Sequence, residues 1–140
     1  MRRALVLASL VSVPALATPP AASPLQPGLW EVTVTMEMPG VTTPMPPHVT
    51  THCIRKEDVA DARKSLPVDK ACKLEDVKQD GNTVTFKSTC KMEMGEMKGS
   101  GRMTQKAQSY EGAMELVANM QGMDFSMKQT FAGKRLGDCK

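Results

Sequence analysis

Residues 72–90 read CKLEDVKQDGNTVTFKSTC, two cysteines that bracket the signature of a β-hairpin. Residues 80–82, Asp-Gly-Asn, supply the turn, because glycine takes a positive φ at little cost and Asp and Asn tolerate it. Residues 83–89 alternate along an extended strand, with Val84 and Phe86 on one face. The pattern therefore predicts two antiparallel strands joined by a tight turn.

The same hairpin predicts a disulfide between its two cysteines. Cys72 and Cys90 each lie nine residues from Gly81, so a three-residue turn places them opposite one another. Directly opposed Cβ atoms lie about 4.5–5.5 Å apart, near the separation that a disulfide requires. Val77 is out of phase with Leu74, which indicates a bulge or irregularity in the first strand.

The remaining two cysteines are Cys53 and Cys139. Four cysteines allow three pairings, and sequence alone does not decide among them. We expect Cys72–Cys90 and, by remainder, Cys53–Cys139, a link that closes a loop of over eighty residues. The alternative is Cys53–Cys72 with Cys90–Cys139, which would close off the segment between the first two cysteines.

Residues 1–17 have the pattern of a cleaved signal peptide. Arg2 and Arg3 precede an apolar run that ends in Ala-Leu-Ala before a polar segment. The run is shorter than the roughly 20 residues that a membrane-spanning helix needs. Pro14 and the Pro-rich sequence after the run argue against a buried N-terminal helix. We expect an exported, periplasmic protein that starts near Thr18 and has no transmembrane segment in its mature chain.

Charge and size limit the classes of function. The full chain carries 18 basic and 15 acidic residues. Without Arg2 and Arg3 the mature chain has 16 basic residues against 15 acidic ones, a net charge of +1. That balance gives no electrostatic footprint for nucleic acid. The mature chain is long enough for one domain with one core, and four cysteines in an exported chain favour two disulfides.

Alternating polarity predicts more strands on both sides of the hairpin. The clearest is residues 29–38, where one face carries Trp30, Val32, Val34, Met36 and Met38. One apolar and one polar face are typical of an antiparallel sheet, and Trp30 is expected to anchor the core. Further strands are predicted at residues 49–54, 98–106, 109–117 and 124–131, and one short helix at residues 55–65.

These elements predict an all-β domain with one short helix within residues 28–140, preceded by a flexible lead-in at residues 18–27. About seven strands at short spacing suggest an antiparallel meander. Such a sheet must curl or be capped to cover its apolar face. We expect a strongly curved sheet or open barrel with the helix at one end, stabilised by disulfides. An immunoglobulin-like sandwich is the alternative.

The order of these features resembles a known family. The chain has PGLWE at residues 27–31, Gly-Asn-Thr at 81–83, Tyr-Glu-Gly at 110–112 and GKRLGDC at 133–139, with the four cysteines among them. In this combination it is similar to the proteobacterial domain-of-unknown-function family 3617, over nearly all of the mature chain. The resemblance implies an exported, periplasmic, four-cysteine β domain, and it implies no activity, cofactor or catalytic residue.

Catalytic chemistry has little support in the sequence. A hydrolase needs a nucleophile, a base and an orienting partner, and no elbow motif surrounds any serine or threonine. His48 and His52 would form a metal pair on a helix, but Pro46, Pro47 and the β-branched residues indicate a strand that holds them far apart. We expect no enzyme, no catalytic residue and no cofactor.

Methionine is the one unusual count, because eleven of twelve follow the predicted signal peptide. Thioethers are soft ligands that suit Cu(I), although methionine also fills irregular cores. Met36 and Met38 continue an apolar strand face and are expected in the core. Met92, Met94 and Met97 follow the hairpin in a segment without clear periodicity, so they are the candidate metal ligands.

Two functions are compatible with these observations. The first is a non-enzymatic envelope module that binds a small apolar ligand or a protein partner at a methionine-lined sheet face or barrel mouth. The alternative is Cu(I) binding or buffering in the periplasm by Met92, Met94 and Met97. A purely structural or assembly role fits the sequence as well.

Overall fold

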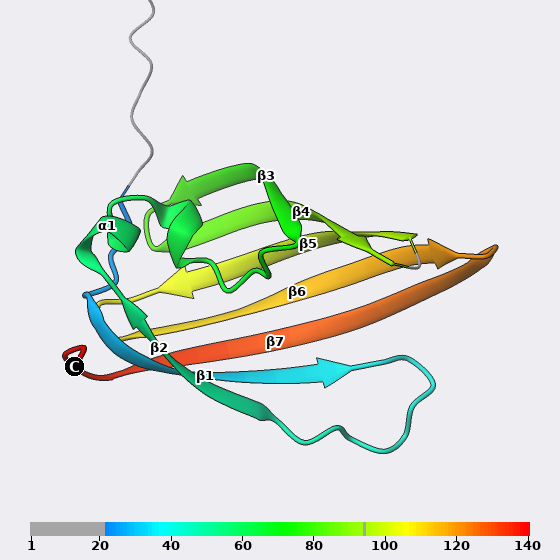
Figure 1. The fold of residues 1–140 in the computed structure, drawn as a ribbon, viewed down its shortest axis with the longest axis horizontal. Coiled ribbons are helices and arrows are strands. Elements are labelled where there is room, and N and C mark those ends of the chain that lie inside the picture. Colours follow the sequence, from blue (N-terminus) through cyan, green and yellow to red (C-terminus); the bar gives the residue numbers. More distant parts are fainter. Residues whose placement is uncertain (1–21, 94) are drawn as a thin grey trace, which may run out of the picture.

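The computed structural model describes residues 22–93 and 95–140. These residues form one antiparallel sheet of seven strands (Figure 1). The strands are β1 (Gly28–Glu37), β2 (His48–Ile54), β3 (Cys72–Asp80), β4 (Thr83–Met92), β5 (Gly95–Gln105), β6 (Ser109–Met120) and β7 (Met123–Gly137). The predicted signal peptide, residues 1–17, lies outside the described residues. No helix in the described ranges has the length and apolar character needed to cross a membrane.

The prediction of an antiparallel meander is confirmed. Strands β3 to β7 are consecutive neighbours, β1 pairs with β7, and β2 pairs with the other side of β1. The sheet is strongly curved and open, with β2 and β3 as its two edges (Figure 1). Because all seven strands belong to one sheet, the alternative of an immunoglobulin-like sandwich is wrong.

The β3–β4 hairpin differs from the prediction in the length of its turn. Asp80 pairs with Thr83, so the turn has two residues, Gly81 and Asn82, instead of three. Gly81 adopts φ +56°, and it occupies the position where a type II′ hairpin turn takes glycine.

A bulge in β3 compensates for the shorter turn. The register shifts by one residue between Glu75 and Lys78, where Asp76 adopts φ +48°. Without the shift, Cys72 would lie opposite the residue after Cys90. With it, the two cysteines are direct cross-strand partners. The irregularity predicted near Val77 is therefore what brings the cysteines into register.

Both predicted disulfides are present. Cys72 bonds to Cys90 and Cys53 bonds to Cys139, with sequence separations of 18 and 86 residues. The alternative pairing of Cys53 with Cys72 is therefore wrong. The longer link ties the end of β2 to the segment after β7, so it joins the first half of the domain to its last residues.

One face of the sheet, which we call the inner face, carries the core. Its buried side chains come from five strands: Trp30, Val32, Val84, Phe86, Met97, Met103, Tyr110, Met114, Leu116 and Phe131. Trp30 is fully buried, as predicted, and its indole stacks on Tyr110 with ring centroids 5.5 Å apart. The alternate residues of each strand form the outer face, which is mostly polar and consists of exposed and half-buried side chains.

Two short helical turns replace the single helix expected at residues 55–65. They are α1 (Lys56–Val59) and η1 (Ala62–Ser65), and both lie over one end of the sheet (Figure 1). Asp61 separates them, because its backbone is extended and its carboxylate accepts a hydrogen bond from the Arg63 amide at 3.0 Å. Because the Asp61 side chain caps the start of η1, the chain does not continue as one helix from α1 into η1.

Residues 22–27 complete the cap over this end, which differs from the flexible lead-in expected there. Leu25 is only 3% exposed and belongs to the core. The amide of Ser23 donates to the carbonyl of Val59 at 2.8 Å, and the amide of Gln26 donates to the carbonyl of Ala107 at 2.9 Å. The Pro- and Ser-rich composition suggests a linker. The segment nevertheless contains one buried leucine and two backbone hydrogen bonds to the rest of the domain.

The Cys53–Cys139 link has a measurable effect on stability. Chain-entropy theory credits a link across 86 residues with about 4.6 kcal/mol. Both cysteines are exposed, so Cys53→Ala with Cys139→Ala removes the link with little loss of packing. We expect urea unfolding to show a free energy of unfolding lower by about that amount. Cys53→Ser with Cys139→Ser is the control and should lose as much, whereas a loss below about 1 kcal/mol contradicts the prediction.

Candidate functional site

The topology gathers most methionines at one end of the sheet, which we call the methionine end. Strands β1, β4 and β6 finish there, and β2, β5 and β7 begin there, opposite the end that carries α1 (Figure 1). The described methionines at or near this end are Met36, Met38, Met45, Met92, Met97, Met120, Met123 and Met127. The number of methionines is evident in the sequence, but their placement at one end of the sheet is not.

A hollow of about 720 Å³ lies at the methionine end, between the β1–β2 loop and strands β1, β6 and β7. This size falls within the range of about 300–1,000 Å³ that is usual for small-molecule sites. Its apolar lining consists of Met36, Met38, Pro39, Val41, Pro44, Met45 and Met127. Met38 and Met45 belong to the β1–β2 loop, and methionine gives such a lining an adaptable surface.

The polar side of the hollow comes from the outer face of the sheet. Lys128 of β7 is the register partner of Glu37 on β1 and of Glu115 on β6. One ammonium group between two carboxylates gives this row a formal charge of −1. Thr35 and Ser126 add hydroxyl groups beside it. The hollow therefore combines an apolar wall with a polar floor that repels anions.

The predicted Cu(I) ligands are not gathered into an exposed group in the part of the chain that the structure describes. Met97 is 8% exposed and pairs with Cys90 in the core, whereas Met92 is 59% exposed beside the β4–β5 turn. Met94 lies outside the described residues. The Cu(I) site at these three residues stays a prediction, and the burial of Met97 does not favour it.

The two histidines lie on a strand, as the sequence indicates, and the structure makes that strand, β2, an exposed edge of the sheet. His48 pairs with Val34 and His52 pairs with Trp30, so four residues of extended chain separate the imidazoles. Partial burial lowers the pKa of His52, and the nearby carboxylate of Asp58 opposes that shift. Among the described residues, no three His, Cys, Asp or Glu side chains are grouped as metal ligands would be.

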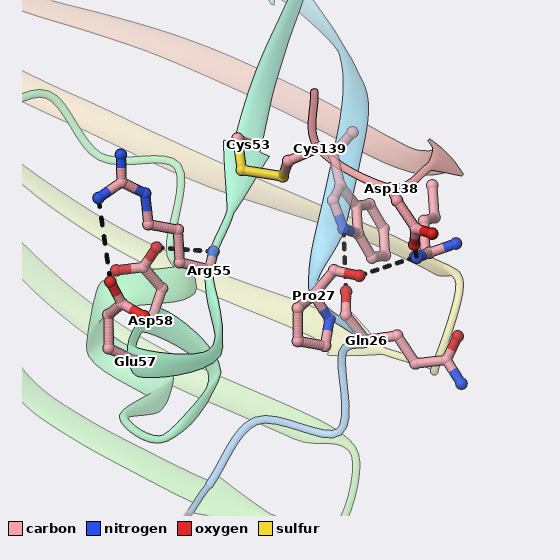
Figure 2. The surroundings of a disulfide bond; sticks show 10 residues. Gln26, Pro27, Cys53, Arg55, Glu57, Asp58, Asp138 and Cys139 are labelled. Atoms are coloured by element: carbon pink, nitrogen blue, oxygen red, sulfur yellow. Dashed lines mark hydrogen bonds and ion pairs between the residues drawn. A yellow bond between two sulfur atoms is a disulfide. The ribbon is translucent and has the colours of Figure 1, made fainter.

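The PGLWE and GKRLGDC motifs meet at the opposite end, beside the Cys53–Cys139 disulfide (Figure 2). Arg135 joins them, because its Nε donates to the Pro27 carbonyl at 2.9 Å and its Nη2 donates to Asp138 Oδ1 at 2.6 Å. The Trp30 indole donates to the Gln26 carbonyl at 3.1 Å.

These contacts show that the motifs form a structural clasp. Gly28 adopts φ +152°, and a Cβ atom there would meet the Arg135 side chain and the Gly137 carbonyl oxygen. Only glycine therefore allows the two segments to approach so closely. The residues that give the sequence its recognisable pattern hold the ends of the domain together, and the hollow lies elsewhere.

The match to known proteins includes both motifs. A family model described as "Protein of unknown function (DUF3617)" matches residues 25–139. The chain belongs to the DUF3617 family. No match was found among curated proteins or among solved structures. The DUF3617 match begins at the buried Leu25 and ends at the disulfide-bonded Cys139, so it covers the sheet, its cap and the clasp.

Tyr110 provides a direct probe of the core, since it is the chain's single tyrosine. Burial raises the pKa of its phenol to about 12. An unfolded tyrosine titrates near pH 10. Because the folded-state pKa is the higher one, the contribution of the neutral phenol to stability is complete below about pH 10 and is lost as the pH approaches 12.

We expect the tyrosinate absorbance of the native DUF3617 domain to rise only near pH 12. The same protein in denaturant is the control and should titrate near pH 10. A native midpoint close to pH 10, with native far-ultraviolet circular dichroism, would show that the phenol is hydrated and that the burial argument is wrong.

Proposed function

We propose that this DUF3617 domain is a non-enzymatic binding module of the cell envelope that holds a small apolar ligand in the hollow at the methionine end. The observation that carries the proposal is the lining itself, with four methionines, two prolines and a valine around about 720 Å³. A typical ligand site is mostly apolar with a few polar groups that fix orientation, and this hollow has that composition.

The chemistry of the lining narrows the class of ligand. Thioether side chains repack around different shapes, so the site suits a flexible hydrocarbon better than one rigid molecule. Glu37, Lys128 and Glu115 have a formal charge of −1 together, which favours a neutral or cationic head group over a carboxylate or phosphate. The ligand class is therefore an uncharged or amine-bearing apolar molecule.

A location outside the cytoplasm is part of the proposal. Two disulfides are typical of an oxidising compartment, and the sequence has a signal-peptide pattern at residues 1–17. Periplasmic export fits both features.

Fluorescence of a neutral naphthylamine probe tests the proposal. We expect saturable binding to the disulfide-intact protein and at least a tenfold weaker affinity for Met38→Gln with Met45→Gln. The change keeps the side-chain length and makes two walls of the hollow polar. Loss of the apolar contact of one methionine is worth about 1.5–3 kcal/mol, and tenfold corresponds to about 1.4 kcal/mol.

Met92→Gln with Met123→Gln is the matched control, because both side chains are highly exposed at the same end but do not line the hollow. This control should bind the probe as the unmodified protein does. Equal weakening by both pairs, or no saturable binding at all, contradicts the proposal. Native mass spectrometry of protein purified from the periplasm should in addition show a retained organic mass.

A further inference from the structure

The two edges of the sheet differ in how they are protected. Edge strand β3 has a register shift at residues 75–78, a positive φ at Asp76 and a row of charges: Lys73, Glu75, Asp76, Lys78 and Asp80. Bulges and charged side chains are the devices that stop an edge from pairing with another strand. Edge strand β3 is therefore built to stay unpaired.

Edge strand β2 has none of these devices. Its sequence, HVTTHCI, has no Lys, Arg, Asp, Glu or Pro, and all seven residues pair with β1 without a register shift. Six of the seven residues are exposed, and Val49 has 53% of its surface accessible. Within the described residues, no loop or helix makes a backbone hydrogen bond to β2. Its outer row of amides and carbonyls is open to another strand.

We propose that β2 pairs with β2 of a second copy of this chain, antiparallel about a twofold axis at Thr51. An isologous pairing sets each residue opposite the one at the same distance beyond the axis. Val49 then faces Cys53, Thr50 faces His52 and Thr51 faces its own copy. β2 has no Lys, Arg, Asp or Glu, and no histidine lies opposite another histidine in this register, so like-charged side chains are not paired across the interface. β-Branched residues are also favourable cross-strand partners.

The residues that flank β2 and the protected β3 edge favour a single second copy over an unlimited stack of strands. Pro46 and Pro47 precede β2 and Arg55 follows it, so pairing is confined to the seven residues between them. The far edge of each copy is the protected β3, which stops further addition. The assembly therefore closes at two copies, with one continuous sheet across both.

Sedimentation velocity of the disulfide-intact mature protein, up to about 1 mM, tests this inference. We expect a concentration-dependent equilibrium of monomer and dimer. Thr51→Lys places two ammonium groups opposite each other at the axis, and Thr51→Glu places two carboxylates there. Each variant alone should dimerise at least tenfold more weakly, because like charges directly opposite are destabilising. An equimolar mixture of the two variants should restore the dimer.

Thr33→Lys is the matched control. Thr33 lies on the same outer face one strand further in, between Val49 and Ala132, so both sides of its strand are already paired. This variant should dimerise as the unmodified protein does. The inference is overturned by an unmodified protein that stays monomeric, by a Thr51→Lys variant that dimerises normally, or by a mixture that fails to recover. Circular dichroism confirms the fold of each variant.

Discussion

The side-chain amide of Gln105 is the interaction on which the capped end of the domain depends. Its Oε1 accepts a hydrogen bond from Ser23 Oγ at 3.1 Å, and its Nε2 donates to Ser65 Oγ at 3.0 Å. Gln105 is fully buried, so these partners are essential to offset the loss of hydration. One glutamine of β5 thereby attaches both η1 and the N-terminal segment to the sheet. A single-layer sheet needs such a cover because its apolar face is otherwise in water.

The two ends of the domain consequently differ in character. The capped end has the stacked Trp30 and Tyr110, the Gln105 hydrogen bonds and the Arg135 clasp, all of which fix side chains in one arrangement. Among the residues that the structure describes, no helix lies over the methionine end (Figure 1). Met36, which was expected in the core, is 38% exposed there, and Met127 is half-buried. A rigid scaffold at one end and adaptable side chains at the other is a common arrangement for a binding domain.

Much of this fold could be predicted because it rests on local patterns. Alternation along residues 29–38 indicated the strand and its core face, and two opposed cysteines indicated their disulfide. The turn length was wrong for a physical reason, since a two-residue turn with a bulge gives Cys72 and Cys90 the same pairing as a three-residue turn. Asp61 likewise divided the expected helix, because a capping carboxylate competes with helical continuation.

The candidate site was much less predictable than the fold. Its lining joins residues 35–45 to Met127 and Lys128, more than eighty positions later, and only the β1–β7 register brings them together. The predicted metal trio stays a prediction, since Met94 lies outside the described residues, but register also matters for its other two members. Cross-strand pairing with Cys90 turned Met97 into a core residue, although it lies close to the exposed Met92 in sequence.

The separation of the methionines has a consequence for oxidative damage. Sulfoxide formation makes a methionine polar, and it occurs first where the sulfur is accessible. Met123 is 72% exposed and Met92 59%, whereas Met103 in the core is fully buried. Oxidants would therefore modify the methionine end long before they reached the residues that hold the sheet together. In a compartment that exposes proteins to oxidants, this DUF3617 domain would lose the apolar character of one end while keeping its fold, and methionine sulfoxide reductase could reverse the change.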